Sequence, residues 1–229
     1  MTESERIARA YRSRSAGVAS RWDLANAGNR AILAERRNLV RRVLDDQGWL
    51  PLGERRLLDV GAGGGAELAW FTELGAVEAN LAGIDLLPER VESARRRFPA
   101  IDFQVGNAER LPFPDASFDI LVAYTLFSSI LDGAMARAVA AEMTRVMKPG
   151  GGLLWYDFRY DSPSNHDVRG VPASRVRDLF PTLRGGFVRL TLLPPLARRL
   201  GPLTGIGYRA LSTLTFLRSH LLALLVKPA

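Results

Sequence analysis

The sequence contains no cysteine, only two histidines, and only two lysines among its 31 basic residues. Without cysteine there can be no disulfide, no thiol nucleophile and no cysteine-ligated metal, and we expect no metal site. A cysteine-free chain is typical of a reducing compartment, so we expect a cytoplasmic protein. The N-terminus lacks the apolar core of a signal peptide. No apolar run approaches the roughly 18–20 residues that a membrane span needs.

The formal charge of +7 comes almost entirely from arginine. The arginines are scattered, and several alternate with acidic residues in stretches with a helical pattern, so the charge does not favour a nucleic-acid partner. With 229 residues, 47% of them apolar, the chain is predicted to form a single domain over 1–229. Within it we expect a helical preface over 1–50, a core over 55–160 and a C-terminal part over 161–229.

A glycine-rich stretch follows the first predicted strand directly. Leu57–Val60 indicates a short buried strand, Gly61 to Gly65 a tight turn, and Ala66 onward a helix. Glycine permits the backbone angles of such a turn and lets a ligand approach the main chain. The spacing fits two templates, the dinucleotide fingerprint Gly-x-Gly-x-x-Ala and the Asp-x-Gly-x-Gly-x-Gly turn of class I methyltransferases. Only the second uses Asp59.

From this turn onward, strand and helix patterns alternate, which predicts an α/β fold with a mostly parallel sheet. The predicted strands are 56–60, 81–85, 101–106, 118–123, 152–157, 187–193 and about 219–226, the last antiparallel. The predicted helices between them are 66–74, 88–97 and 134–147, preceded by helices over 5–11 and 31–44. A helical insertion is expected over 194–217.

Polar residues follow two further strands, where ligands usually bind in such folds. Asp85 ends the second strand, and its carboxylate could accept hydrogen bonds from a ribose diol. Asn107 follows the third strand and could pair with an adenine, or could simply stabilise a turn. Tyr124 and Thr125 follow the fourth strand, and an aromatic face there could attract a sulfonium or could merely be buried.

Taken in order, these blocks resemble a class I S-adenosylmethionine (SAM)-dependent methyltransferase, nearest to the small-molecule UbiE/menaquinone-like branch. The resemblance covers roughly 55–160 and includes Gly106-Asn107-Ala108-Glu109, Ser117-Phe118-Asp119 and the turn Lys148–Gly151. It implies a Rossmann-like fold with a seven-stranded sheet, helices on both faces and SAM as cofactor. It also implies that Asp59 and the glycines hold the methionine end, Asp85 the ribose, and Asn107 with Ala108 the adenine.

The full expected cofactor-binding set is Asp59, Gly61, Ala62, Gly63, Gly65, Asp85, Leu86, Asn107, Ala108, Glu109, Tyr124 and Thr125. The family often has Asp where this chain has Asn107, and an amide should still reach an adenine. The implied activity is methyl transfer to a partly apolar small molecule, most simply to a hydroxyl of a natural product, sugar or lipid-like compound. Segments 1–50 and 160–229 match nothing that identifies that acceptor.

Two residues are candidates for handling the acceptor's proton. His166 lies in the loop after the fifth strand, and Asp157 ends that strand. A histidine titrates near neutral pH, so it can serve as a base. His220, at the start of the last strand, is expected to be structural. The insertion over 194–217 mixes leucines with arginines; we favour a cap that walls an apolar acceptor pocket over a membrane-surface helix, because glycine and proline interrupt it.

Three other functions share parts of this pattern. A nicotinamide-dependent oxidoreductase would use the same glycine turn and Asp85, but leaves Asp59 unexplained and lacks a Tyr-x-x-x-Lys pair. An RNA or protein methyltransferase would be expected to carry an Asn-Pro-Pro-Tyr-type block or a binding domain. A catalytically silent SAM-binding subunit differs only in turnover.

Overall fold

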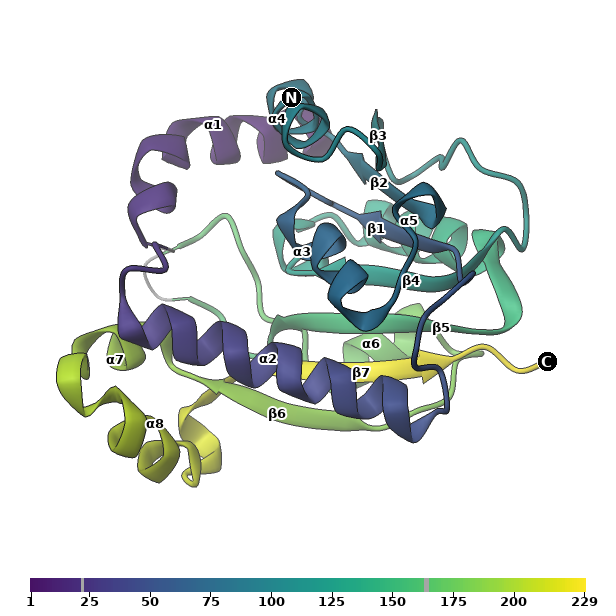
Figure 1. The fold of residues 1–229 in the computed structure, drawn as a ribbon. Helices are drawn as coiled ribbons and strands as arrows, with labels where there is room; N and C mark the ends of the chain where they lie inside the picture. The colour runs from purple at the N-terminus through teal and green to yellow at the C-terminus, as the bar shows by residue number, and fades with distance from the viewer. Residues whose placement is uncertain (22, 163–164) are drawn as a thin grey trace.

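A computed structural model describes residues 1–21, 23–162 and 165–229. Its centre is one seven-stranded sheet in the order β3-β2-β1-β4-β5-β7-β6 (Figure 1). The neighbours from β3 to β5 are parallel, whereas β7 runs antiparallel to both β5 and β6. The strands are β1 Leu57–Val60, β2 Leu81–Asp85, β3 Asp102–Val105, β4 Phe118–Tyr124, β5 Met147–Phe158, β6 Phe187–Leu192 and β7 Arg218–Val226. The predicted sheet, including its antiparallel last strand, is confirmed.

The central strands are apolar along their whole length because both faces of the sheet are covered. Successive side chains point to opposite faces, so Leu58 packs into one core and Leu57 into the other. The same alternation separates Trp155 from Tyr156 in β5. Helices α5 and α6 cover the first face, and α2, α3 and α4 cover the second.

The helices are α1 Glu3–Arg21, α2 Ala27–Asp46, α3 Ala66–Ala69, α4 Pro88–Arg97, α5 Gly133–Val146, α6 Ala173–Leu179, α7 Pro194–Arg199 and α8 Thr204–Ser212. Short 3-10 turns are η1 Trp70–Leu74, η2 Glu78–Asn80, η3 Phe127–Ser129, η4 Gly201–Leu203 and η5 Thr215–Leu217. The predicted helical preface and the insertion before the last strand are therefore present. None of the helices in the described ranges has the length and apolarity needed to cross a bilayer.

Four elements differ from the sequence prediction. The helix predicted over 66–74 is divided into the four-residue α3 and the 3-10 turn η1. Helix α1 extends from Glu3 to Arg21, well beyond the expected 5–11. Helix α6 was not predicted, because its seven residues bury only Val176 and show no apolar period. The turn expected around Lys148 is instead part of β5, because Met147 already pairs with Phe118.

The strand order reverses between β1 and β4: β2 and β3 extend to one side, and β5 to the other. At such a switch point the connections leave the two strands in opposite directions and open a crevice at their carboxyl ends. Helix α1 lies over this end of the sheet in Figure 1, and α2 runs along the other side of the crevice.

Candidate functional site

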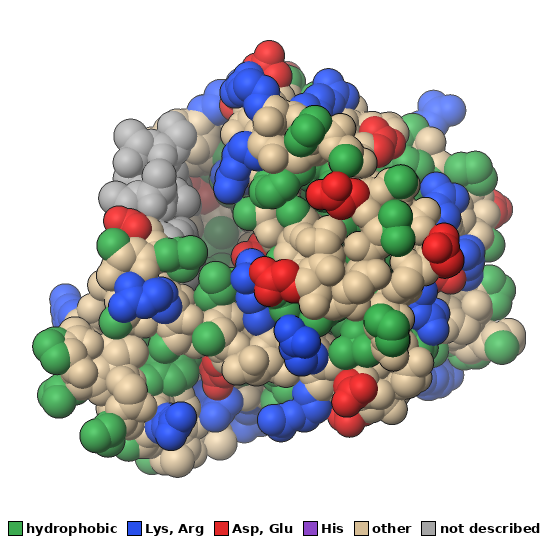
Figure 2. All heavy atoms as spheres, viewed as in Figure 1, with side chains coloured by type: hydrophobic (Ala, Val, Ile, Leu, Met, Phe, Trp, Pro, Cys, Tyr) green, Lys and Arg blue, Asp and Glu red, His purple; other side chains and the backbone are tan. Residues whose placement is uncertain are grey.

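A cavity of about 1090 Å³ occupies the crevice at the carboxyl ends of the strands. Figure 2 shows the surface hollowed between α1, α2 and the start of α3. Residues from the loops after β1, β2, β3 and β4 line one side, and residues of α2, β5, α7 and β7 line the other. Of the expected cofactor-binding set, the lining includes Gly61, Asp85, Leu86, Asn107, Ala108, Tyr124 and Thr125.

The glycine turn after β1 borders the cavity, and its backbone adopts left-handed angles that favour glycine. Gly61, Gly63 and Gly65 all have positive φ, at 84°, 55° and 79°. A Cβ on Gly65 would come within 2.5 Å of the Phe103 ring, so this glycine serves packing inside the fold. Gly61 lines the cavity itself, where its missing side chain leaves the backbone accessible. The helix that follows the turn, α3, has only four residues.

Asp85 ties this turn to the second strand. Its carboxylate accepts hydrogen bonds from the backbone N–H of Gly63 at 2.8 Å and of Leu87 at 2.9 Å. A carboxylate has about four acceptor positions, so lone pairs remain for a ligand. Because Asp85 is nearly buried and lines the cavity, those lone pairs are suited to a diol.

Asp59 lies buried beneath the turn, and among the described residues none donates a hydrogen bond to it. Burial, together with the charges of Glu67 and Asp85, raises the pKa of this carboxyl from 3.8 to about 8, against the opposing charge of Arg36. A bound ligand with a positive charge or N–H donors would supply what this carboxylate lacks. Asp85 as an acceptor in the cavity wall, with the Asp59 carboxyl behind that wall, thus fits a ribose and a positively charged amino group in one molecule, which is the chemistry of SAM.

The third loop contributes Asn107, whose side chain already stabilises a turn. Its Oδ1 accepts from the Glu109 N–H at 3.0 Å, and its Nδ2 donates to Glu109 and to Ser4 of α1. Ala108 beside it lines the cavity, whereas Glu109 is exposed and does not. Asp59, Ala62, Gly63 and Gly65 are likewise absent from the lining and support the site from behind.

Arg36 was missed by the sequence reasoning, although it lies in the cavity wall. It projects from α2 between the rings of Tyr124 and Tyr156, with its guanidinium carbon 5.0 Å from each centroid, and forms an ion pair with Glu67. Burial of this kind is rare for a cation unless it is paired. The signal was present: Ile32, Arg36 and Val40 share one face of α2, so a charge interrupts an apolar face.

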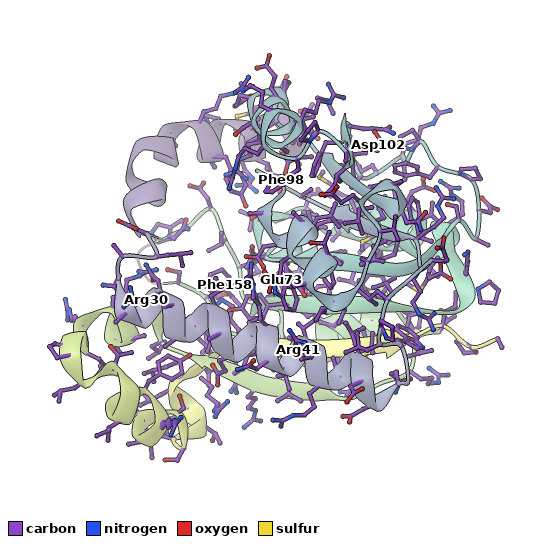
Figure 3. All side chains as sticks on the ribbon, viewed as in Figure 1. Arg30, Arg41, Glu73, Phe98, Asp102 and Phe158 are labelled. Atoms are coloured by element: carbon purple, nitrogen blue, oxygen red, sulfur yellow. The ribbon has the colours of Figure 1, made fainter. Side chains whose placement is uncertain are left out.

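His220 lines the cavity as well and was expected to be only structural. Its ring stacks on Tyr156, with centroids 4.6 Å apart and planes 6° apart, and packs against Phe158, which is labelled in Figure 3. Burial and the nearby Arg36 charge lower the pKa of His220 from 6.5 to about 3, so the ring is neutral.

The hydrogen bonds of Ser219 identify the tautomer. Its Oγ lies 3.1 Å from the Thr191 carbonyl, which can only accept, and 2.8 Å from Nδ1 of His220. A hydroxyl has one hydrogen, so it donates to Thr191 and accepts from Nδ1–H. The Nε2 lone pair of His220 is therefore free, and no described residue bonds to it. The result is an uncharged hydrogen-bond acceptor in the cavity wall.

The two residues proposed from sequence for proton transfer lie elsewhere. His166 is exposed, and it is not among the residues that line the cavity. Asp157 is fully buried behind the wall, where its carboxylate accepts from the N–H groups of Ser128 at 2.9 Å and Phe158 at 2.8 Å. Burial raises the pKa of Asp157 to about 6 despite these hydrogen bonds.

Helix α1 closes the cavity from above. Arg6 donates to the Ser129 carbonyl, the Tyr11 hydroxyl bonds Ser129 Oγ at 2.8 Å, and Glu3 accepts from the Leu131 N–H. These contacts join residues more than 100 positions apart, so sequence patterns could not show them. Arg6, Ile7, Ala10, Tyr11 and Ser13 line the cavity from this side. The N-terminal preface thus covers the site, in addition to any scaffolding role.

The insertion between β6 and β7 contributes less to the cavity than expected. Of residues 194–217, only Pro194, Pro195 and Arg198, all in α7, belong to the lining. The apolar residues expected to wall the pocket do not reach it. Leu196, Leu200, Leu211 and Leu217 instead pack around a small separate core that contains Ile32 and Tyr208. The expected cap is therefore wrong for α8 and holds only for the first turn of α7.

Comparison with known proteins finds sequences similar to part of the chain. Residues 58–155 match the methyltransferase domain family. The chain is 36% identical over 143 residues to the demethylmenaquinone methyltransferase of Deinococcus radiodurans, covering 56% of this chain and 58% of that protein. It is 36% identical over 135 residues to phthiotriol/phenolphthiotriol dimycocerosates methyltransferase 1 of Mycobacterium ulcerans, covering 53% of this chain and 45% of that protein. The chain thus spans about half the length of these curated relatives.

Solved structures show the same fold at low sequence identity. A crystal structure from Galdieria sulphuraria, titled as that of a sarcosine dimethylglycine methyltransferase, superimposes with a TM-score of 0.65 at 16% identity, over 86% of each chain. The [4+2]-cyclase SpnF superimposes with a TM-score of 0.58 at 21% identity, over 82% of this chain and 81% of that one. These likenesses concern the fold alone. With the glycine turn and the strand order, they show a class I SAM-dependent methyltransferase fold, and over residues 58–155 the sequence is similar to the UbiE-like branch of that family.

Proposed function

We propose that this protein transfers a methyl group from SAM to a partly apolar small molecule, most simply to a hydroxyl group. The observation that carries the proposal is a cavity of about 1090 Å³, which has a carboxylate-lined side and an aromatic side. Ligand pockets usually measure about 300–1,000 Å³, so this one has room for a cofactor and an acceptor together. Methyl transfer requires both molecules in one space.

The cofactor side is formed by the loops after the first four strands. The backbone at Gly61, with the Asp59 carboxyl buried behind it, would face the amino-acid end, Asp85 would hold the ribose, and Leu86 with Asn107 and Ala108 the base. When bound there, SAM supplies a methyl group activated by a sulfonium charge. Thr125 and the half-buried Tyr124 also line the cavity.

The acceptor side is formed by α2, β5, α7 and β7. The free Nε2 of His220 would accept a hydrogen bond from the acceptor hydroxyl and orient its oxygen. The Arg36 charge would stabilise negative charge that develops on that oxygen. Ile32, Leu33 and Leu193 supply apolar contacts, and α1 excludes water from the closed site.

This assignment makes His220 an orienting hydrogen-bond acceptor and not the base that the sequence suggested for His166, because a ring with a pKa near 3 does not keep a proton at neutral pH. An exposed His166 could reach the acceptor only if its loop moved inward. Asp157 could act only through the backbone that it holds at Ser128 and Phe158. The placement of His220 in the wall supports direct contact, so it is the residue that we assign to the acceptor.

The relatives' names suggest where to search for the acceptor. They include quinone and long-chain lipid methyltransferases, and the apolar lining here fits an acceptor with a hydrocarbon portion. The [4+2]-cyclase among the structural neighbours shows that this fold does not by itself fix the reaction. A silent SAM-binding role is therefore the second candidate, and turnover decides between the two.

The experiment is a label-transfer screen. Purified protein with methyl-labelled SAM is incubated with lipid and polar fractions of a bacterial extract, and products are identified by mass spectrometry. We expect a labelled product in an apolar fraction that disappears in Asp85→Ala. Label that enters only RNA or protein would contradict the small-molecule proposal. SAM binding without any turnover across the panel would favour the silent subunit.

A further inference from the structure

The segment from η4 to η5 exposes an unusual set of apolar side chains. Leu203 is 69% exposed, Ile206 82%, Leu214 42% and Phe216 66%. We call these four residues the α8 face. They account for four of the ten large exposed hydrophobic residues among the described ones, within fourteen positions of the sequence. Figure 2 shows hydrophobic side chains protruding at the corner formed by α7 and α8.

Helix α8 is amphipathic in the reverse of the usual sense. The residues that it buries are Thr204, Tyr208 and Ser212, which are polar and lie at i, i+4 and i+8. Tyr208 donates to Glu35 at 2.7 Å and accepts from the Leu192 N–H. Polar contacts therefore hold the helix to the body of the protein, whereas Ile206 points outward. A soluble surface helix normally has the opposite arrangement.

The charge around the α8 face has one sign. From Leu179 to the last residue the sequence contains no Asp or Glu, but it contains six arginines and one lysine. Arg199 and Arg209 flank the face and are exposed. Neither forms an ion pair or hydrogen bond with any part of the chain that the structure describes. Apolar side chains beside free cations complement a membrane surface, where acyl chains lie beneath anionic headgroups.

The α8 face is continuous with the rim of the cavity. Helix α7, directly before η4, contributes Pro194, Pro195 and Arg198 to the cavity wall. Leu24 is 51% exposed and also lines the cavity. The Asn26 side chain donates to the Arg198 carbonyl, which keeps the segment around Leu24 against α7. An apolar molecule at the α8 face would thus be next to the cavity mouth.

We propose that the α8 face docks this protein on an anionic lipid bilayer, with Leu203, Ile206, Leu214 and Phe216 in the headgroup region and Arg199 and Arg209 on the phosphates. The docking itself does not depend on methyl transfer. Delivery of a membrane-dissolved acceptor to the cavity rests on the proposed function. Few side chains insert, so binding is reversible and sensitive to salt.

The test is vesicle sedimentation of the full-length protein. Phosphatidylcholine vesicles are compared with vesicles that contain about one-third phosphatidylglycerol, at two salt concentrations. Wild type is expected to pellet with the anionic vesicles, and much less with neutral ones or at high salt. The double variant Ile206→Gln/Phe216→Gln should lower the bound fraction at least about fivefold, and Arg199→Gln/Arg209→Gln should abolish the preference for anionic lipid.

A matched control is Val77→Gln/Val105→Gln, which removes two exposed apolar residues outside the α8 face and should bind as wild type does. Wild type that stays in the supernatant with both vesicles overturns the proposal. Light scattering that shows a dimer lost in Ile206→Gln/Phe216→Gln, without vesicle binding, would assign the face to self-association instead. SAM affinity is measured in every variant and should not change, so failure of docking is distinguishable from failure of the cofactor site.

Discussion

Replacing Asp59 by Asn should change stability and cofactor affinity in opposite directions. The Asp59 carboxyl is buried beneath the glycine turn, and burial raises its pKa from 3.8 to about 8. Between these two values the folded protein holds a proton that the unfolded chain has released. Stability from this group is therefore fully present below pH 3.8 and is lost as the pH rises through 8.

The size of the effect follows from the shift. One pKa unit corresponds to about 1.4 kcal/mol, so the contribution of Asp59 should fall by roughly 3–4 kcal/mol between pH 5 and pH 8. Asparagine has no proton to lose. The free energy of unfolding of Asp59→Asn, relative to wild type, should therefore increase by about that amount over the same window. Meanwhile the loss of the carboxylate should weaken SAM binding about tenfold or more at pH 7.5.

The assay is urea unfolding of both proteins at several pH values without ligand, followed by calorimetric titration with SAM. Taking the difference between the two proteins cancels other titrating groups such as Asp157. The exposed Asp46 provides the control, because Asp46→Asn makes the same change of side chain outside the buried site. If the Asp59→Asn difference does not vary with pH, the inference of an uncompensated buried carboxylate is refuted.

Further predictions concern Asp85 and the histidines. Asp85→Ala should weaken SAM binding by about 1.5–3 kcal/mol, or roughly 10–150-fold, by calorimetry, and unchanged affinity would reject the ribose assignment. His220→Gln should lower kcat/KM at least about tenfold for an identified acceptor, with SAM affinity within about twofold. Since the pKa of His220 is near 3, the rate should show no histidine titration between pH 5 and 8. His166→Gln should change kcat/KM less than about threefold. A larger loss with a shifted pH profile would mean that His166 takes part in the reaction.

The cofactor side could be predicted from sequence because its signals are local. The turn from Gly61 to Gly65 follows a buried strand, and Asp85 ends the next strand. Parallel strands bring their carboxyl ends to one edge, so the pattern alone places these residues together. The bonds from Gly63 and Leu87 to Asp85 were not predictable, but they strengthen that placement.

The acceptor side could not be predicted in this way. Arg36 on α2 and His220 on β7 both contact the Tyr156 ring. They do so only because β7 lies between β5 and β6 in the sheet and α2 packs on that part of the sheet. Nothing near either residue marks it in the sequence except the interruption of an apolar pattern. His166 had the stronger local signal, a histidine in a loop at the sheet edge, yet its side chain is exposed.

Helix α8 shows a different limit. Its Ile206 and Leu211 predicted burial against the cavity, because apolar side chains usually face a core. The polar residues Thr204, Tyr208 and Ser212 repeat at helical spacing as well, and they are the buried ones, whereas Leu211 is only partly buried and Ile206 is exposed. Which face of α8 packs inward depends on Glu35 of α2, which accepts a hydrogen bond from Tyr208 and lies 173 residues from it in the sequence.

The claim that the Gly61–Asp85 side of the cavity holds SAM can be tested most directly by one pair of calorimetric titrations. Wild-type protein at pH 7.5 is titrated with S-adenosylhomocysteine and, separately, with NADH. The account predicts one-to-one binding of S-adenosylhomocysteine and no heat from NADH. Binding of NADH without binding of S-adenosylhomocysteine would contradict the account.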